Sequence, residues 1–295
     1  MKLAVFDDFR IGVVNGDKLH DVTGALPDWL GEIRSQRMNW LIANWATVRD
    51  RIVALGTTSD AIAVASVTLM PPSPTPPHVF AAPANYRKHI GELGDRVVTK
   101  KGRSAREQGF FLKAPGSLVG AGGVIGLPRD STRRFDHESE LAVIIGRHGR
   151  NIPRAEAMQY VFGYSCLIDA TMRIEPGVAE EERSMRKSFA GFTPLGPYLV
   201  TADEVAEPRN LHNQLWVNGE LRQDANTKDM IVDIAELIEL ISSVLPISPG
   251  DVIATGTPEG VGPFAPGDTV RIAIESIGDM SLSVRQNEKL SPRAY

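Results

Sequence analysis

The chain has 295 residues, 42% of them hydrophobic, and its 32 basic and 36 acidic side chains give a net charge of −4. These values are typical of a globular protein with one large domain, or a large domain and a small one. The charge balance argues against nucleic acid or an anionic membrane as partner, and no apolar stretch approaches the roughly 18 residues of a membrane span.

The first 75 residues are predicted to form a small α+β unit. Residues 2–6, 11–14 and 18–22 are predicted strands, with a hairpin turn at Asn15-Gly16. Apolar side chains recur at steps of three and four from residue 38 to 55, which predicts one helix that Gly56 ends. Five prolines in residues 71–77 predict a stiff linker. We place the domain boundary there, between residues 1–75 and 76–295.

The rest of the chain alternates short apolar runs with Gly and Pro. Two helices are predicted, at residues 154–161 and 228–243. The pattern predicts a strand-dominated α+β fold with a mixed sheet and flanking helices. Predicted strands are residues 109–113, 123–127, 140–145, 164–168, 198–201, 215–217, 251–255, 269–275 and 280–285.

The compartment is indicated by the single Cys and by the N-terminus. Cys166 lies inside an apolar run and has no intrachain partner, which is typical of a reducing compartment. The N-terminus contains Asp7 and Asp8 before any signal-like apolar core develops. We therefore expect a cytoplasmic protein.

Residues 135–146 place Glu138 and Glu140 at the head of an apolar run typical of a buried strand. Side chains alternate along a strand, so the two carboxylates share a face, and His137 and Ser139 point to the other. Two buried carboxylates side by side repel each other and need either protonation or a cation. A divalent metal is the natural solution.

A third acid, Asp169, follows a second apolar run at residues 161–168. Oxygen ligands without a Cys or His cluster favour a hard ion such as magnesium, manganese or calcium. The alternative is structural, because any one of these acids is also explained as a strand-end residue paired with an arginine. The adjacent Glu-x-Glu pair favours the metal.

His89 and Glu92 are three residues apart and would meet on one face of a short helix. A carboxylate beside an imidazole raises its basicity and fixes its tautomer, which prepares a histidine to take a proton from water. The alternative is a solvated pair on a charged surface. The metal site decides between these interpretations.

Other polar residues are candidates for substrate contacts. Lys113 ends a predicted strand and Lys187 follows a basic run, so either could bind a carboxylate or an oxyanion, although a lysine at a strand end usually faces solvent. The loop at residues 255–262 resembles an anion cradle of backbone amides, but lacks the ending of a phosphate loop. A hairpin at Asn218-Gly219 would bring Gln223 back along its second strand, where its polar side chain could contact a substrate.

These residues together resemble the fumarylacetoacetate hydrolase family over about residues 80–285. The resemblance implies a mixed β-sandwich roll, a homodimer, and Mg²⁺ or Mn²⁺ as cofactor for chemistry on a small 2-oxo acid. The matching positions are Asn85-Tyr86 with His89 and Glu92, Phe111 to Pro115, Asp136 to Ala142, Asp169 with Thr171 and Arg173, Lys187-Ser188-Phe189, Pro194 to Pro197, Val217 to Glu220 and Thr255 to Pro258.

The resemblance also implies roles for individual residues. It makes Glu138, Glu140 and Asp169 the metal ligands, and His89 with Glu92 the catalytic pair on a lid that closes over the substrate. Lys113 and Lys187 become charge stabilisers. The residues expected to contact substrate are Tyr86, Arg173, Gln223 and Thr257.

The expected reaction is metal-dependent hydrolysis of a carbon–carbon bond in a 2-oxo or 2,4-dioxo acid, such as a fumarylpyruvate- or acylpyruvate-like product of aromatic-ring cleavage. The same residues would serve a decarboxylase or isomerase of ring-cleavage 2-oxo diacids. A catalytically silent protein whose metal only stabilises the fold is the alternative from another class.

The chain departs from the family pattern at four places. His137 replaces a common tyrosine, Ile168 a common asparagine and Ala190 a common aspartate. The fourth is the basic segment at residues 95–107, which is longer and more charged than a typical lid. It could favour a dicarboxylate, or form a mobile solvated loop. Its cations are Arg96, Lys100, Lys101, Arg103 and Arg106.

Overall fold

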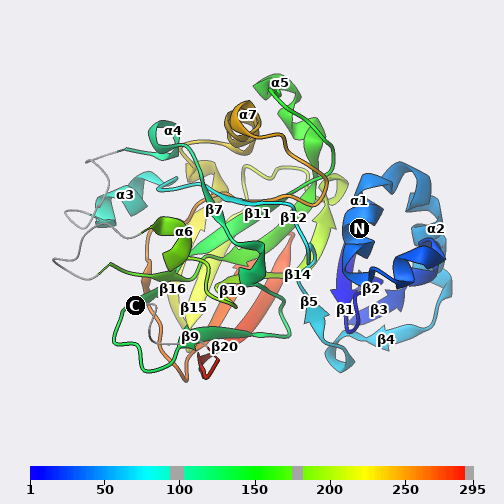
Figure 1. Cartoon of the computed structure of the whole chain (residues 1–295), viewed down its shortest axis with the longest axis horizontal. Helices are drawn as coiled ribbons and strands as arrows, with labels where there is room; N and C mark the ends of the chain where they lie inside the picture. The colour runs from blue at the N-terminus through cyan, green and yellow to red at the C-terminus, as the bar shows by residue number, and fades with distance from the viewer. Residues whose placement is uncertain (94–102, 175–181, 290–295) are drawn as a thin grey trace.

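Two β-sheets that pack against each other form the centre of the protein, and a smaller N-terminal lobe, formed by residues 1–70, lies at one side (Figure 1). The computed structural model describes residues 1–93, 103–174 and 182–289. The large sheet runs in the order β4 (Ala61–Ala63), β3 (Lys18–Asp21), β2 (Arg10–Asn15), β1 (Lys2–Phe6), β14 (Thr193–Thr201), β12 (Val161–Ile168), β11 (Ser139–Ile145), β17 (Val252–Ala254), β6 (Val79–Ala81) and β7 (Phe111–Lys113), with β5 (Leu69–Met70) beside β1 and β8 (Leu118–Val119) beside β14.

A five-stranded sheet packs on one face of the large sheet, and a three-stranded sheet adjoins them. Parallel pairs such as β17–β6 occur among mostly antiparallel ones, so the predicted strand-dominated α+β fold with a mixed sheet is confirmed. The five strands are β16 (Glu220–Asn226), β15 (His212–Val217), β19 (Thr269–Ile274), β20 (Gly278–Asn287) and β9 (Val124–Pro128), and the three are β13 (Thr171–Met172), β10 (Phe135–His137) and β18 (Gly262–Pro263).

The main core lies between the large sheet and the five-stranded sheet. Along β11, Leu141, Val143 and Ile145 point into this core. Ala142 and Ile144 point to the opposite face and pack with side chains of the N-terminal lobe. Because both faces of β11 are covered, the strand is apolar over this whole run.

The helices lie around the sheets. In Figure 1, α5 and α7 lie side by side at the top, and α3, α4 and α6 lie on the side away from the N-terminal lobe. The helices are α1 (Arg37–Ala43), α2 (Trp45–Thr58), α3 (Arg87–Leu93), α4 (Ala105–Gln108), α5 (Arg154–Ala157), α6 (Arg183–Arg186) and α7 (Ile234–Val244).

The single helix predicted for residues 38–55 is in fact two helices. Asn44 leaves helical geometry between α1 and α2, and its side-chain Nδ2 donates to the carbonyl of Trp40 at 2.8 Å. Gly56 does not end the helix. A Cβ at Gly56 would lie 3.2 Å from the Cβ of Val13, so this glycine allows α2 to pack closely on β2.

The other two predicted helices are shorter than expected. Residues 154–161 form α5 and a 3-10 turn at Met158–Tyr160, and β12 begins at once after the turn. Residues 228–243 begin in a 3-10 turn, and α7 starts only after Asp233. The carboxylate of Asp233 accepts from the backbone N–H of Glu236 at 2.9 Å and caps the helix.

The N-terminal lobe shares both sheet and core with the rest of the chain. β1 pairs with β14, and apolar side chains of the lobe pack with Leu195 and Leu199 of β14. The proline-rich segment is packed and is not a free linker. Ser73 is buried and its Oγ donates to the carbonyl of Gly250 at 2.7 Å. The domain boundary in this segment stays a prediction.

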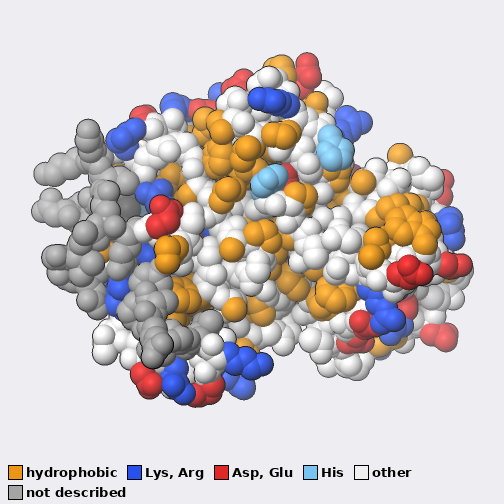
Figure 2. Space-filling model, in the orientation of Figure 1, with side chains coloured by type: hydrophobic (Ala, Val, Ile, Leu, Met, Phe, Trp, Pro, Cys, Tyr) orange, Lys and Arg blue, Asp and Glu red, His pale blue; other side chains and the backbone are white. Residues whose placement is uncertain are grey.

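Side chains of different kinds are mixed on the face shown in Figure 2. Acidic and basic groups are interspersed, and apolar groups gather on the N-terminal lobe and at the upper centre of the view. Trp29 and Ile33 of this lobe have exposed fractions of 54% and 47%. Over the described ranges, no helix is both long and apolar enough to cross a membrane.

Candidate metal centre and active site

Three buried carboxylates converge where β10 passes into β11 beside the end of β12. Glu138 lies between β10 and β11, Glu140 is the second residue of β11, and Asp169 follows β12 directly. The strands are antiparallel neighbours, and the backbone N–H of Asp169 donates to the carbonyl of Glu138 at 2.8 Å. One oxygen from each acid lies within 4.8 Å of the others. The register of two strands therefore assembles the cluster.

The predicted alternation of side chains is observed at this point. His137 and Ser139 face the five-stranded sheet, where Ser139 Oγ donates to Asn213 and His137 Nδ1 lies 3.2 Å from Gln223 Oε1. The two glutamates face the other way, toward Asp169. Two of the family departures, His137 and Ile168, are thus buried residues that support the strands around the cluster.

Cations surround two of the three acids. Lys187 Nζ lies 2.7 Å from Glu138 Oε2 and 2.6 Å from Asp169 Oδ2, and Arg173 Nη2 donates to Glu138 Oε1 at 2.7 Å. Lys113 Nζ forms an ion pair with Asp169 and is almost wholly buried, so this strand-end lysine does not face solvent. The structure thus brings the two predicted lysines together at Asp169.

The acids differ in pKa because their neighbours differ. Burial alone would raise the pKa of Glu138, but the charges of Lys187 and Arg173 outweigh it and hold that pKa well below its usual range. Burial raises the pKa of Glu140 well above its usual value, and the negative charges of Asp169 and Glu138 raise it further. Glu140 is therefore the acid whose charge is least neutralised.

This donor set fits a hard divalent cation. All three ligand groups are carboxylates, they come from rigid strands, and they surround a space small enough for one ion. The repulsion at Glu140 is what a dication relieves when it binds. Glu138, Glu140 and Asp169 are the residues that would hold Mg²⁺ or Mn²⁺ here.

The predicted His–Glu pair lies on α3, close to the cluster. His89 is 5% exposed, and its Nδ1 is 3.5 Å from Glu92 Oε2. Burial lowers the pKa of His89 more than the nearby charge of Glu138 raises it. The imidazole is therefore neutral near pH 7 and available to accept a proton. Because the imidazole is buried, it is not on a solvated surface, whereas the Glu92 side chain is 41% exposed.

The loop at residues 255–262 connects the carboxylate cluster to α3. The backbone N–H of Gly256 donates to Glu140 Oε2 at 2.6 Å, and the N–H of Gly260 donates to Glu92 Oε1 at 2.7 Å. Both glycines have positive φ, +97° and +86°. The loop amides do bind anions, as the sequence indicated, but those anions are carboxylates of this chain.

Gln223 holds this loop in place. Its Oε1 accepts from the backbone N–H of Ser139 at 2.9 Å, and its Nε2 donates to Thr257 Oγ1 at 2.8 Å and to the carbonyl of Pro258 at 3.0 Å. The side chain is wholly buried. The side-chain amide of Gln223 thus forms its hydrogen bonds within the protein and does not face a substrate. The Thr257 hydroxyl accepts one of these hydrogen bonds.

Tyr86 and Arg173 were also expected to contact substrate. The Tyr86 hydroxyl is buried and finds no hydrogen-bond partner among the described residues. Burial, and next the charge of Glu140, raise the pKa of this tyrosine. Arg173 is held by Asp136 and Glu138 at 2.7 Å each, with its side chain 25% exposed. Tyr86 has free hydrogen-bonding capacity, whereas Arg173 mainly neutralises acids.

Sequence reasoning assigned no role to Thr171 or Asp136. Thr171 Oγ1 accepts from Lys187 Nζ at 2.7 Å, and Asp136 anchors Arg173. Both positions were part of the family resemblance, but only the fold shows what they bind. Within the basic segment, residues 95–102 lie outside the described residues, and Arg106 is paired with Glu236 at 2.7 Å.

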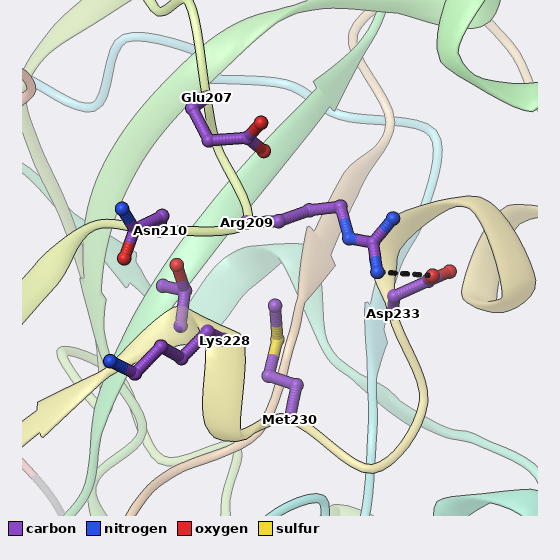
Figure 3. A pocket seen from close by; sticks show the side chains of 7 residues that line it. Glu207, Arg209, Asn210, Lys228, Met230 and Asp233 are labelled. Atoms are coloured by element: carbon purple, nitrogen blue, oxygen red, sulfur yellow. Dashed lines mark ion pairs between the residues drawn. The ribbon is translucent and has the colours of Figure 1, made fainter.

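A separate cavity of about 360 Å³ lies near the start of α7 (Figure 3). None of the three carboxylates of the cluster lines it. Met230, on its wall, forms an isolated backbone bridge with Tyr86. Its lining residues are Glu207, Arg209, Asn210, Thr227, Lys228, Met230 and Asp233, and Arg209 and Asp233 form an ion pair at 3.6 Å.

The fold and the site together define a class of protein: a strand-dominated α+β protein in which a buried cluster of three carboxylates, able to hold a metal ion, lies beside a His–Glu pair. Residues 78–285 match the family model described as Fumarylacetoacetate (FAA) hydrolase C-terminal. The chain belongs to this family, as its motifs predicted.

Individual relatives resemble the chain over nearly its full length. A maleylpyruvate hydrolase of Aquipseudomonas alcaligenes is 43% identical over 293 residues, which cover 97% of this chain and 99% of that protein. The crystal structure of a maleylpyruvate hydrolase from Sphingobium sp. SYK-6 has a TM-score of 0.84 and 40% identity, with 97% and 100% of the two chains covered. The same enzyme in complex with manganese(II) ion and pyruvate has a TM-score of 0.83 and 39% identity, with 98% and 100% covered. The predicted Mg²⁺ or Mn²⁺ agrees with the metal in that complex.

Proposed function

We propose that this protein is a metal-dependent hydrolase that cleaves a carbon–carbon bond in a 2,4-dioxo acid of the maleylpyruvate or fumarylpyruvate kind, as part of aromatic-compound catabolism. The observation that carries the proposal is the buried cluster of Glu138, Glu140 and Asp169 beside the buried imidazole of His89, which lies next to Glu92. Its similarity to maleylpyruvate hydrolases over nearly the whole chain supports the reaction class.

The cofactor we propose is Mg²⁺ or Mn²⁺. When bound, such an ion supplies a Lewis acid that holds the 2-oxo acid end of a substrate and stabilises negative charge on its oxygen. Lys187 and Lys113 hold Glu138 and Asp169 in position for this role. The backbone of Gly256 does the same for Glu140.

His89 is the general base of the proposed reaction. Its neutral imidazole takes a proton from water. Glu92, whose Oε2 lies 3.5 Å from His89 Nδ1, is itself held by the backbone N–H of Gly260. The oxygen of that water adds to the distal carbonyl carbon. The bond from this carbon to the neighbouring methylene then breaks, and the electron pair leaves with pyruvate as its enolate. A proton returned to the methylene carbon completes pyruvate and a second acid.

Product analysis tests this proposal. Purified protein with Mn²⁺ should release pyruvate and the second acid in equal amounts from a 2,4-dioxo acid, and EDTA should abolish the release. Chromatography separates the three possible outcomes. Carbon dioxide from oxaloacetate without dioxo-acid cleavage would favour the decarboxylase, and a rearranged diacid of unchanged mass would favour the isomerase.

We further propose a homodimer in the cytoplasm. The family resemblance implies the dimer, and the single Cys, which is buried, suits a reducing compartment. Light scattering after gel filtration should give twice the mass of one 32.1 kDa chain. A monomer mass at micromolar concentration would exclude the dimer.

A further inference from the structure

Arg183 is a partly buried cation close to the proposed metal centre. It begins α6, which packs against β7. Its guanidinium carbon lies 5.3 Å from the ring centroid of Phe111, and its Nη2 donates to the neutral amide oxygen of Gln108 at 3.2 Å. Among the residues that the structure describes, no carboxylate lies within ion-pair distance of it. Within the described ranges, its guanidinium is held by a neutral amide and an aromatic ring.

The environment of Arg183 disfavours an unpaired charge. Burial lowers the pKa of Arg183, although the charges of Glu138, Glu182 and Asp169 act in the opposite direction. A guanidinium nevertheless stays protonated in proteins. A carboxylate ligand therefore stabilises a partly buried guanidinium more than it stabilises a solvent-exposed guanidinium.

Neighbouring cations around the cluster are already engaged. Lys113 and Lys187 bind Asp169, and Arg173 binds Asp136 and Glu138. These three side chains neutralise the metal-site acids and their supports. Arg183 differs from them because its hydrogen-bond partner is an uncharged amide.

The distance from Arg183 to the cluster suits a substrate with two carboxylates. Lys187 Nζ, which touches Glu138 and Asp169, lies 5.5 Å from the centroid of the same Phe111 ring. The two cations are thus no farther apart than about 11 Å, the sum of their distances to that ring. A seven-carbon diacid spans about 7 Å between its carboxyl carbons, since three bonds of an extended chain span about 3.5 Å. Hydrogen bonds at the two ends of the diacid span the rest of the distance between the cations.

We propose that Arg183 binds the distal carboxylate of a dicarboxylic 2,4-dioxo acid and so makes the enzyme prefer diacids over acylpyruvates with an uncharged tail. This inference rests on the proposed function, because it assigns the end of the substrate that is remote from the metal. Arg183 is then a specificity-determining residue: it contacts the substrate but takes part in no bond change.

The test compares two substrates in two variants. Arg183→Gln removes the charge, and Arg147→Gln is the matched control, because Arg147 is an exposed arginine beyond the opposite end of β11 from Glu140. The substrates are a dicarboxylic 2,4-dioxo acid and an acylpyruvate of equal length with an uncharged tail. We expect Arg183→Gln to lower kcat/KM at least tenfold for the diacid and less than threefold for the acylpyruvate. The control should change neither.

Two outcomes would overturn the inference. An equal loss with both substrates would mean that Arg183 supports the fold of the site, and no loss with either would mean that it only packs on Phe111. Arg183→Lys should recover part of the preference for the diacid, since it restores the charge without the planar fork.

A binding measurement separates this inference from the proposed reaction. Calorimetry on the Mn²⁺-loaded protein would compare two inert seven-carbon 2-oxo acids, the diacid 2-oxoheptanedioate and the monoacid 2-oxoheptanoate, in wild type and in Arg183→Gln. We expect the wild type to bind the diacid more tightly than the monoacid. The ratio of the two Kd values should fall at least tenfold in the variant. If neither dioxo acid is hydrolysed but this loss is seen, the proposed reaction fails and the role of Arg183 stands. If the preference is absent or unchanged, Arg183 is not the carboxylate receptor.

Discussion

At the scale of single residues, the two glutamates of the cluster should respond in opposite ways to loss of charge. Glu138 is paired with Lys187 and Arg173, whereas Glu140 faces two acids and accepts from one backbone amide. In metal-free protein, Glu138→Gln leaves Lys187 and Arg173 each short of one carboxylate and should lower Tm by several degrees. Glu140→Gln removes a repulsion and should leave Tm unchanged or raise it. Thermal unfolding in EDTA measures both, and a large drop for Glu140→Gln would contradict this account.

Metal should stabilise the wild type through the same residues. A ligand at a hundred times its Kd adds about 2.7 kcal/mol to the free energy of unfolding. Adding Mn²⁺ to EDTA-treated wild type should therefore raise Tm, and Glu140→Gln should lose most of that rise. An undiminished rise in Glu140→Gln would place the metal elsewhere.

His89 should matter for turnover and not for metal binding. His89→Gln keeps a polar side chain but removes the base, so kcat should fall by about a hundredfold to ten-thousandfold. Manganese affinity, measured by calorimetry, should stay within threefold of the wild type, because His89 is not among the three acids of the cluster. Unchanged turnover would instead favour the catalytically silent alternative.

At the scale of structural elements, the loop at residues 255–262 connects the carboxylate cluster to the proposed base. Gly260 has a φ of +86°, and a Cβ there would lie 2.0 Å from the carbonyl oxygen of Arg222. Gly267 also has positive φ, +101°, but open space around it. Gly260→Ala should therefore lower kcat and stability together, because the loop must shift and release Glu92. Gly267→Ala should cost about 1 kcal/mol of stability and leave kcat unchanged. Equal effects on kcat would exclude the positioning role of the loop.

The predictions of structural elements were correct where a short sequence pattern determines the element. Runs such as residues 161–168 are recognisable because a strand covered on both faces is apolar throughout, and the Glu-x-Glu pair is recognisable because strands alternate. The break at Asn44 was missed, since the apolar spacing continues across it and only the fold shows the side chain bonded to Trp40.

Other parts of the site depend on contacts between distant segments. Lys113 meets Asp169 because β7 and α6 pack near the end of β12, and no spacing in the sequence predicts that meeting. Gln223 was expected to face a substrate, yet the hairpin turns it into the space between His137 and Thr257. A hairpin fixes which residues pair but not which side chain of another sheet it meets.

At the scale of the whole molecule, the N-terminal lobe and the rest of the chain should unfold together. β1 extends the large sheet through β14, and the lobe shares an apolar core with β11, β12 and β14. Trp29, Trp40 and Trp45 lie in the lobe and Trp216 in the five-stranded sheet, so fluorescence reports mainly on the lobe. Fluorescence and far-ultraviolet circular dichroism should therefore give coincident urea transitions. An earlier fluorescence transition would show that the lobe unfolds alone.

The loop that holds both Glu140 and Glu92 by its backbone has a consequence for how this scaffold diversifies. Main-chain amides are supplied by almost any residue, so the chemistry does not depend on the identity of the loop's side chains, apart from the two glycine turns. The proposed contact to the distal carboxylate of the substrate comes from Arg183 on α6, which is a different segment. Substitutions on α6 can thus retune which acids are accepted while the reactive centre is inherited unchanged.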